Sequence, residues 1–402
     1  MSNTPQVRFA GFTDAWEQRK LGEMGSTYTG LSGKTKEDFG HGEAKFITYM
    51  NVFSNPVADL QMTESVEIDS KQNCVKAGDV FFTTSSETPE EVGMSCVMPE
   101  SADNIYLNSF CFGYRPTEKF DLNYLAYVLR AESFRKEMTF LAQGISRYNI
   151  SKNKVMEVEI PVPSLDEQSK IGQYFSNLDH LITLHQRKCD ALQKFKKSML
   201  QKMFPKNGSL YPEIRFAGFT DAWEQREFGE VGSVSMCKRI FKDETVDDGE
   251  IPFYKIGTFG SEPDAYISRE LYEEYRSKYS YPHKGDILLS ASGTIGRIVE
   301  YNGEEAYFQD SNIVWLSHDE TISNLFLKTL YPIVKWNGIE GSTIKRLYND
   351  NFLKTKFMMP SLSEQTQIGT FFSTLDHLIT LHQRKLETLK KLKKSMLQKM
   401  FI

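Results

Sequence analysis

Apolar residues recur at alternating steps of four and three residues along two stretches of the chain. This spacing places them on one stripe of a helix and is typical of a coiled coil. Two lysines, Lys196 and Lys393, also fall on the stripes. We therefore predict two helices of about 38 residues, each about 57 Å long. The predicted seam consists of Ile171, Phe175, Leu178, Ile182, His185, Leu192 and Met199 in the first helix and Ile368, Phe372, Leu375, Ile379, His382, Leu389 and Met396 in the second.

Both predicted helices begin with the same signal. Ser164 and Ser361 each stand three residues before a glutamate, Glu167 and Glu364. This is a capping box, in which serine and glutamate side chains each accept from a free backbone N–H of the first turn. One such helix cannot bury its seam alone, and each buried apolar side chain contributes about 1.5–3 kcal/mol. We expect the two helices to pair, and we favour antiparallel pairing, which relates two variable domains by a pseudo-two-fold axis.

The chain repeats itself. Residues 9–19 (FAGFTDAWEQR) return unchanged at 216–226, and residues 178–188 (LDHLITLHQRK) return unchanged at 375–385. Matches of this length identify an internal duplication. The segments between the repeats are unlike each other, so two halves share a repeated frame and differ in a variable domain. This organisation suggests a reader of an asymmetric target with two parts.

The variable segments, about 21–160 and 228–357, mix short β-prone runs with turn signals and helical stretches. We predict an α+β fold with a mostly antiparallel sheet in each. Expected strands are 45–49, 79–84, 158–163, 253–256, 285–290 and 357–360, and expected helices are 122–139 and 323–335. The repeated segment 9–19 is rich in aromatic and turn residues, so we expect it to dock rather than to form a helix. The predicted domains are 1–163 and 205–360, separated and followed by coiled-coil helices at 164–204 and 361–402.

Charge is distributed unevenly along this chain of net charge −5. The repeated helices are basic, whereas the variable domains are mildly acidic. Because non-specific DNA affinity comes from neutralising phosphates, the acidic total predicts weak DNA binding by this chain alone. A basic partner, or basic residues focused on one face, would have to supply affinity. No apolar stretch approaches the ~18 residues of a membrane span. We expect no signal peptide, and the scattered cysteines fit the cytoplasm.

Two basic stretches precede the helices at equal distance, at 143–154 and 342–356. Basic residues interleaved with Tyr and Asn suit phosphate and base contacts. A solvated surface loop is the alternative for both stretches. The loop 292–296 (SGTIG) lacks the Lys-Ser/Thr of a nucleotide-binding loop. It is either a turn that approaches DNA or a plain structural turn.

Residues that could carry catalysis or bind a metal form no convincing set. His180 and His185, like their copies His377 and His382, are five residues apart, whereas neighbours on one helix face lie three or four apart. We interpret His185 and His382 as seam residues. Cofactor-binding glycine motifs, nucleotide-binding motifs and an amino-methyltransferase motif are missing from the sequence. We expect no catalytic residues, no metal site and no cofactor site in this chain.

The repeated segment RFAGFTDAWEQR, the turns Lys76-Ala77-Gly78-Asp79 and Lys284-Gly285-Asp286, and the block Pro-Ser-Leu-x-Glu-Gln-x-x-Ile at 163–171 and 360–368 resemble the specificity subunit of type I restriction–modification enzymes. The resemblance covers the whole chain. It departs from the pattern in the first half, which has Thr84 to Thr88 (TSSET) where the second half has its Ser-Gly-Thr-Ile-Gly loop. Contacts proposed for one loop therefore cannot simply be transferred to the other.

The resemblance implies a non-catalytic subunit with two target-recognition domains, each reading one half of a bipartite double-stranded DNA site. It implies an antiparallel helical spacer that docks two adenine methyltransferase subunits and, through them, restriction/translocase subunits. Those partners would use S-adenosylmethionine, ATP and Mg. The alternative is a coiled-coil scaffold that joins two protein clients without touching DNA. Candidate DNA contacts are Lys45, Ser85, Ser86, Arg147, Tyr148 and Lys152 in the first half and Lys238, Arg239, Lys255, Ser292, Thr294, Arg297, Lys345 and Arg346 in the second.

Overall fold

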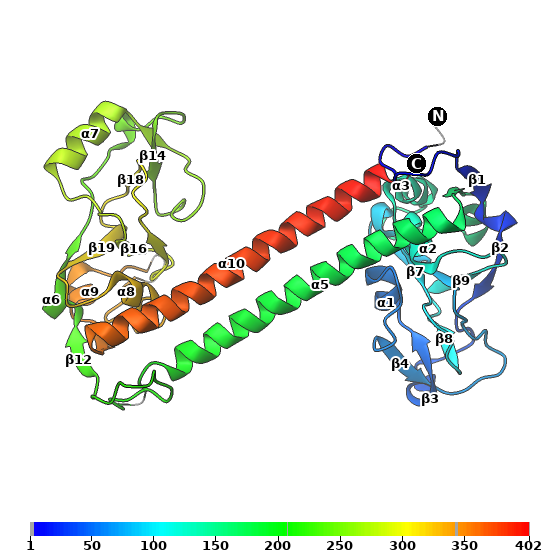
Figure 1. The fold of residues 1–402 in the computed structure, drawn as a ribbon, viewed down its shortest axis with the longest axis horizontal. Helices are drawn as coiled ribbons and strands as arrows, with labels where there is room; N and C mark the ends of the chain where they lie inside the picture. Colours follow the sequence, from blue (N-terminus) through cyan, green and yellow to red (C-terminus); the bar gives the residue numbers. More distant parts are fainter. Residues whose placement is uncertain (1–3, 207, 342–344, 402) are drawn as a thin grey trace. The chain divides into compact units, whose positions relative to one another are not determined.

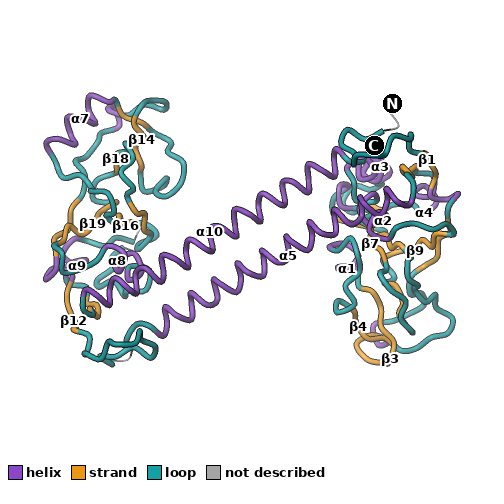
Figure 2. Tube along the Cα trace, in the orientation of Figure 1, coloured by secondary structure: helices purple, strands orange, loops and turns teal. Residues whose placement is uncertain are grey.

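The chain forms two compact units in a computed structural model that describes residues 4–206, 208–341 and 345–401 (Figure 1). One unit comprises Met1–Arg187 with Gln383–Ile402, and the other comprises Lys188–His382. Each unit therefore contains one mixed α/β domain and parts of both long helices. Figure 2 shows strands and loops confined to the domains.

The two long helices are α5 (Leu165–Lys202) and α10 (Leu362–Lys399), each of 38 residues, as predicted. In the first unit the beginning of α5 lies with the end of α10, and in the second unit the end of α5 lies with the beginning of α10. The helices are therefore antiparallel. The predicted seam residues are all buried or half-buried, whereas Leu181, Leu184, Leu378 and Leu381 beside the seam are exposed.

The helix starts differ from the predicted capping box in one respect. The Ser164 and Ser361 hydroxyl oxygens accept from the backbone N–H of Glu167 and Glu364, each at 3.4 Å. The glutamate carboxylates do not complete the expected reciprocal cap, because both are buried and bind an arginine of the repeated opening segment instead. Tertiary pairing with a cation thus outcompetes the local bond, since a buried carboxylate needs a charged partner more than a backbone N–H does.

The first domain contains a four-stranded sheet and a three-stranded sheet. The first has the strand order β2-β9-β5-β7 and the second β4-β3-β8, with the further pairs β1-β11 and β6-β10. The strands are β1 (Glu17–Lys20), β2 (Gly25–Thr29), β3 (Phe39–Ile47), β4 (Thr63–Val66), β5 (Val80–Thr83), β6 (Ser85–Ser86), β7 (Ser95–Val97), β8 (Ile105–Leu107), β9 (Cys111–Pro116), β10 (Tyr148–Asn149) and β11 (Glu159–Val162). The helices are α1 (Tyr49–Ser54), α2 (Leu122–Val128), α3 (Glu132–Leu141) and α4 (Lys152–Met156), with 3₁₀ turns at Leu21–Glu23, Lys36–Asp38 and Pro89–Glu91.

The second domain repeats this plan with different details. Its sheets are ordered β13-β19-β16-β17 and β15-β14-β18, and β12 pairs with β20. The strands are β12 (Glu224–Glu227), β13 (Gly232–Ser235), β14 (Ile251–Tyr254), β15 (Tyr266–Ile267), β16 (Ile287–Ser290), β17 (Ile298–Glu300), β18 (Tyr307–Phe308), β19 (Ile313–His318) and β20 (Lys356–Met359). The helices are α6 (Phe228–Val231), α7 (Arg269–Lys278), α8 (Asn324–Leu330) and α9 (Asn349–Leu353), with a 3₁₀ turn at Lys242–Glu244.

The predicted α+β class with mostly antiparallel pairing is confirmed. Among the named strands of the described residues, the parallel pairs are β3 with β8 in the first domain and β14 with β18 in the second. The helix predicted over 122–139 is instead two helices, α2 and α3. Between them Arg130 turns inward and donates to the carbonyls of Ser95, Val52 and Asn55. The helix predicted over 323–335 ends at Leu330, and the strand predicted over 45–49 ends at Ile47 because Thr48 caps α1.

The repeated opening segment docks without forming a helix, as predicted. Trp16 and Trp223 are each buried in the core of their own domain. The strand that follows each tryptophan pairs with the strand that precedes the long helix: Glu17 lies opposite Val162, and Glu224 opposite Met359. The start and the end of each variable domain are therefore hydrogen-bonded neighbours.

The ends of the long helices belong to the domain cores. In the first unit Phe401 lies on Phe175 with ring centroids 5.6 Å apart, and on Tyr124 at 5.8 Å. In the second unit Phe204 lies 5.8 Å from Phe326 and 6.5 Å from Phe372. Since each domain packs on the start of one helix and the end of the other, it holds the two helices in a fixed antiparallel register.

Candidate nucleic-acid interface

A hairpin projects from the first domain at residues 143–149. The Gln143 N–H donates to the Asn149 carbonyl at 2.9 Å, and the Asn149 N–H donates back at 2.8 Å. Strand β10 of this hairpin pairs with β6, placing Tyr148 opposite Ser86. At the tip Ile145 is 95% exposed, and Arg147 is also exposed. The basic stretch predicted before the first helix is thus a protruding β-hairpin.

The second domain has a hairpin at the matching position. The Glu340 N–H donates to the Arg346 carbonyl at 3.0 Å, and the Arg346 N–H donates back at 2.8 Å. The offset from Gln143 to Glu340 is the same as the offset between the identical segments 178–188 and 375–385 of the two long helices. Residues 342–344, which belong to the second predicted basic stretch, lie outside the described residues. Lys345 is exposed, and Arg346 is half-buried.

Both hairpins rest on the same framework. The Ile150 N–H donates to the Thr84 carbonyl at 3.0 Å, and the Leu347 N–H donates to the Ala291 carbonyl at 2.8 Å. Ser85 pairs with Asn149, and Ser292 pairs with Arg346. The segments after Thr84 and after Ala291 therefore occupy equivalent places, although their sequences differ. The structure thus places Thr84 to Thr88 where the second half has its Ser-Gly-Thr-Ile-Gly loop, in agreement with the alignment made from the sequence.

Three predicted DNA contacts support the hairpins from beneath. Ser85, Ser86 and Ser292 are buried, and the Ser86 hydroxyl donates to Glu91 at 3.2 Å. Because they are buried, these side chains present little surface to a nucleic acid, and their contact with DNA stays a prediction. Thr294 is exposed, but its carbonyl accepts from the Ser290 hydroxyl at 2.6 Å and helps to close the 292–296 turn.

The other predicted contacts in the second domain are mostly engaged within it. Arg239 pairs with Asp310 at 2.7 Å, and Lys255 pairs with Asp264 at 2.9 Å. Arg297 donates to the Ile256 carbonyl. Lys238 is exposed, with its Nζ 5.2 Å from the ring centroid of Tyr279.

Two predicted contacts of the first domain do not belong to the hairpin. Lys45 is an exposed residue of β3, in a different sheet from β6 and β10. Lys152 is exposed in the first turn of α4. Both can meet a polyanion, but the structure does not bring them together with Arg147 in one hollow.

The Lys-Ala-Gly-Asp turn of the first domain is structural. Asp79 is buried and accepts from Arg115 Nη2 at 2.6 Å, from the Tyr28 hydroxyl at 2.7 Å and from the Lys76 N–H at 2.8 Å. Burial, followed by the Asp79 charge, raises the pKa of Tyr28 well above its usual range. Asp286 of the second domain likewise accepts from the His283 N–H at 2.7 Å. These aspartates fix a turn, and their chemistry points to no ligand.

The first hairpin borders a hollow that contains three predicted DNA contacts together with residues that the sequence did not single out. A hollow of about 650 Å³ is lined by Tyr49, Met50, Phe53, Ser85, Ser86, Glu87, Glu91, Ser146 and Arg147. Burial raises the pKa of Tyr49, whose hydroxyl donates to the Ser85 carbonyl at 2.7 Å. The sequence marked Ser85, Ser86 and Arg147 but carries no signal for the contribution of α1, because α1 and the hairpin meet only through tertiary packing.

The second domain has its own hollow beside the base of its hairpin. This hollow, of about 640 Å³, is lined among others by Arg239, Glu340, Arg346, Asp350 and Lys354. Arg346 donates to the side chains of Ser311 and Asn312 at 3.3 and 3.2 Å. Each domain thus combines arginine with glutamate beside its hairpin, but with different neighbours.

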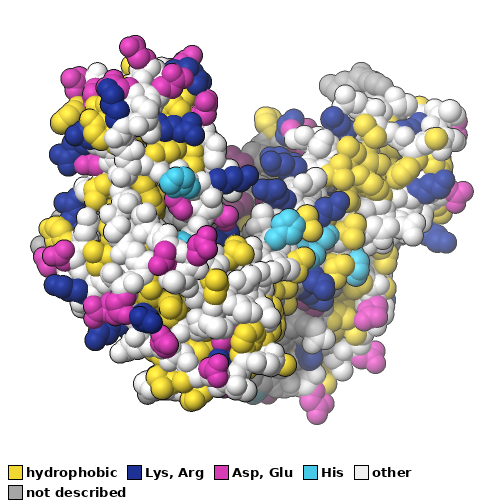
Figure 3. All heavy atoms as spheres, turned by 60° about the vertical axis from the view of Figure 1, so that its left-hand side comes forward, with side chains coloured by type: hydrophobic (Ala, Val, Ile, Leu, Met, Phe, Trp, Pro, Cys, Tyr) yellow, Lys and Arg dark blue, Asp and Glu magenta, His cyan; other side chains and the backbone are white. Residues whose placement is uncertain are grey.

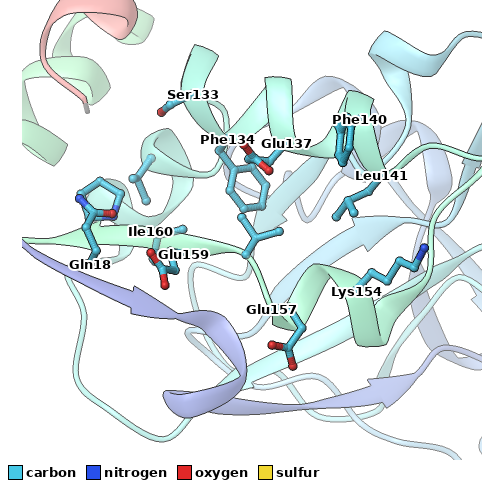
Figure 4. Close-up of a pocket in the computed structure, with 13 residues that line it drawn as sticks. Gln18, Ser133, Phe134, Glu137, Phe140, Leu141, Lys154, Glu157, Glu159 and Ile160 are labelled. Carbon is cyan, nitrogen blue, oxygen red and sulfur yellow. The ribbon is translucent and has the colours of Figure 1, made fainter. Parts of the chain in front are cut away.

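A further hollow in the first domain does not suit a polyanion. It has a volume of about 620 Å³ and lies between α3 and the segment from α4 to β11 (Figure 4). Glu137, Glu157 and Glu159 line it together with Lys154. Three carboxylates against one ammonium group repel phosphate, so we exclude this hollow from the nucleic-acid interface.

Charges of both signs are mixed elsewhere on the surface. Figure 3 shows acidic and basic side chains interleaved over the part of the second domain that carries α7. Within residues 4–206, 208–341 and 345–401, no cluster of three or more His, Cys, Asp or Glu side chains is arranged to hold a metal ion. In the same ranges, no helix is long and apolar enough to cross a membrane.

Comparison with known proteins assigns the chain to a family. The family described as type I restriction modification DNA specificity domain matches residues 13–194 and again residues 220–391. A type I restriction enzyme specificity subunit of Haemophilus influenzae is 45% identical over 267 residues, which are 65% of this chain and 67% of that protein. The MjaX specificity subunit of Methanocaldococcus jannaschii is 22% identical over 98% of this chain and 95% of its own length.

Solved structures share the fold. The S subunit of the type I restriction–modification system from Mycoplasma genitalium superposes with a TM-score of 0.63 at 17% identity, covering 99% of both chains. A second structure, from work on assembly of the type I system, gives 0.51 at 18% identity over 95% of this chain and 96% of that chain. With two matched copies of the specificity domain on one duplicated fold, this chain belongs to the family of type I restriction–modification DNA specificity proteins.

Proposed function

We propose that this chain is a DNA-recognition subunit without catalysis of its own, which reads a bipartite, asymmetric site with one half-site for each variable domain. The observation that carries this proposal is the pair of hairpins at 143–149 and 340–346. They rest on the same framework but present different side chains. Equivalent frames with different reading surfaces are what recognition of two unlike half-sites requires.

The repeated helices support docking of two copies of one partner. Leu181 and Leu184 of α5, and their copies Leu378 and Leu381 of α10, are exposed within identical sequences. Exposed apolar side chains that recur on two equivalent surfaces are typical of protein interfaces. We propose that each surface receives an adenine methyltransferase subunit. These partners, which bind S-adenosylmethionine, would in turn recruit restriction/translocase subunits that use ATP and Mg.

The methyltransferase subunits would also compensate for the net negative charge of the chain, which is unfavourable for DNA binding. With net charge −5, the chain has little non-specific affinity for DNA. A partner that encloses the DNA would contribute most of the phosphate contacts, while the hairpins contribute the base contacts. The partner would then supply catalysis and most of the DNA affinity, and this chain would supply the DNA sequence specificity.

A domain exchange tests the proposal. Residues 228–357 are replaced by the corresponding variable domain of another family member, and methylated adenines are mapped in cells that contain the methyltransferase subunit. One half of the methylated motif should change, while the other half stays the same. If both halves changed together, the two domains would not read independently. If methylation in these cells did not depend on this chain, and the assembly bound DNA with no linear dependence of log K on log salt, a DNA-free scaffold would be the better description.

A further inference from the structure

The hollow beside the first hairpin combines an apolar wall with charged residues of both signs, whereas a phosphate-binding surface needs mainly positive charge. Its apolar wall comes from α1, where Tyr49 and Phe53 stack with ring centroids 6.0 Å apart and planes at 18°. Met50 extends this wall and is 54% exposed. The Tyr49 hydroxyl is tied to the backbone of β6, so the wall and the hairpin support belong to one rigid assembly.

The charged residues of the hollow are of both signs. Arg147 and Glu87 are exposed, and neither forms an ion pair with any other residue that the structure describes. Glu91 accepts from Ser86 at 3.2 Å and also lines the hollow. A phosphate bound to Arg147 would lie near these carboxylates and be repelled by them. The edge of a base pair avoids this conflict, because it carries hydrogen-bond acceptors and donors side by side.

We propose that this hollow is a base-reading site for the first half-site, with Arg147 and Glu87 as specificity-determining residues. Arg147 donates to the acceptor edge of a guanine in the major groove, and Glu87 accepts from the exocyclic amino group of a cytosine. These are the base partners that guanidinium and carboxylate groups fit. Met50 supplies the apolar contact at the adjoining position. This inference rests on the proposed function and assigns Arg147 to a base, whereas the sequence suited its stretch to phosphate and base contacts alike.

The second domain also places an arginine and a glutamate together beside its hairpin, which supports the same kind of base reading. There Glu340 and Arg346 lie at the base of the matching hairpin and line one hollow. A carboxylate again accompanies an arginine on a surface that would face DNA. Since the neighbouring side chains differ from those of the first hollow, the two sites would prefer different base pairs.

Substitutions at Arg147 separate base reading from phosphate binding. Arg147→Lys keeps the positive charge but loses the planar pair of donors, and Glu87→Gln keeps the shape but replaces one acceptor oxygen by a donor. These two variants and Arg147→Ala, which removes the guanidinium group, are each assembled with the methyltransferase subunit, and methylated motifs and DNA affinities at several salt concentrations are measured. Lys71→Gln and Glu100→Gln, at exposed positions of the same domain, are the matched controls.

We expect each variant to relax one position of the first half-motif by about tenfold or more, with the second half-motif unchanged. The controls should retain the full motif. An unchanged motif in both Arg147→Lys and Glu87→Gln would overturn the inference, and a flatter salt slope in Arg147→Ala with an intact motif would return Arg147 to the phosphate backbone. If the unsubstituted assembly methylated no two-part motif at all, the proposed function would fail rather than this inference.

Discussion

The two halves of this protein share one repeated frame, but the first half forms a hydrogen bond in it that the described residues of the second half do not. In the first half, buried Glu167 accepts from Arg8 at 2.6 and 2.8 Å and from the indole N–H of Trp16 at 3.0 Å. In the second half, Glu364 accepts from Arg215 at 2.7 Å through both oxygens. The equivalent indole N–H, that of Trp223, has no partner among the described residues. The ion pair is therefore the shared requirement, and the indole bond is an addition.

A second difference concerns how each domain holds the helices. In the first unit Lys393 of α10 pairs with Asp179 of α5 at 2.6 Å, and Asp179 also accepts from the Tyr127 hydroxyl of the domain at 2.8 Å. In the second unit Lys196 pairs with Asp376 at 2.5 Å. The lysines on the predicted seam thus find an aspartate of the other helix at both ends, as polar residues that set register and orientation do. Among the residues that the structure describes, a tyrosine of the domain joins the pair only in the first unit.

A third difference concerns the side chains that pack against two glycines at matching positions, Gly93 in the first domain and Gly296 in the second. A Cβ added to Gly93 would meet Met138 Sδ at 3.2 Å, and one added to Gly296 would meet Trp336 Nε1 at 3.1 Å. Met138 lies on α3, whereas Trp336 lies in the segment that takes the place of that helix in the second domain. The two domains therefore fill one position with side chains from different kinds of element.

The largest expected effect comes from making the halves identical. Fragment 1–204 contains one domain and one helix, and we expect it to dimerise with Lys196 and Phe204 taking the places of Lys393 and Phe401. An identical pair has a true two-fold axis, so its methylated site with the methyltransferase subunit should become a palindrome of the first half-site. Sedimentation and methylation mapping test this. A folded fragment that stays monomeric at micromolar concentration would contradict it.

The buried glutamates give the next largest effect. Replacing Glu167 or Glu364 by alanine leaves an arginine without its partner, and breaking a buried pair costs about 3–5 kcal/mol. Glu167→Ala should cost about 1 kcal/mol more, because it also removes the Trp16 bond. Hydrogen exchange of each unit under denaturant measures both losses. Equal losses, with Asp166→Ala as a control on the exposed first turn, would show that the indole bond contributes nothing.

The two glycines should respond unequally to alanine. Both have positive φ, +64° and +88°, so each substitution carries a backbone cost of about 1–2 kcal/mol. We expect Gly296→Ala to be the more damaging, because the Trp336 ring cannot yield as the flexible Met138 side chain can. Thermal unfolding of both variants tests this. A larger loss for Gly93→Ala would mean that the second domain is the more adaptable of the two.

The smallest effect belongs to the lysine–aspartate pairs. Their side chains are 22–39% exposed, so each pair contributes about 1 kcal/mol or less. A double-mutant cycle on Asp179 and Lys393, compared with one on Asp376 and Lys196, should give similar coupling energies. Tyr127→Phe should lower only the first. A change in the second cycle caused by Tyr127→Phe would contradict independent action at the two ends.

The repeated frame could be predicted from the sequence because its signals are local. The steps of four and three fixed the length of α5 and α10, and the identical segments revealed the duplication. The bond partners of Glu167 were missed, since Arg8 is distant in sequence and no periodicity links the two. The capping box favoured a local bond that a buried cation outcompetes.

The candidate site was only partly predictable for the same reason. The basic stretch around Arg147 marked the hairpin, but its pairing with β6 is a long-range contact. Ser85 and Ser86 were named as candidate DNA contacts, whereas the pairing with β10 buries most of their surface. Glu87 and Met50 gave no signal, because only the packing of α1 against the hairpin support brings them to one hollow.

The pairing of β1 with β11, and of β12 with β20, has a consequence for inheritance. Each variable domain leaves and rejoins the frame at two adjacent positions, Glu17 beside Val162 and Glu224 beside Met359. A reciprocal exchange of coding sequence within the repeated segments would therefore deliver a whole domain whose ends already lie next to each other. The breakpoints would fall in the opening segment and in the long helix, where the two halves have identical sequence, so the exchanged domain would meet matching residues on both sides. New combinations of half-sites could then arise in a single genetic event, without intermediates that fail to fold.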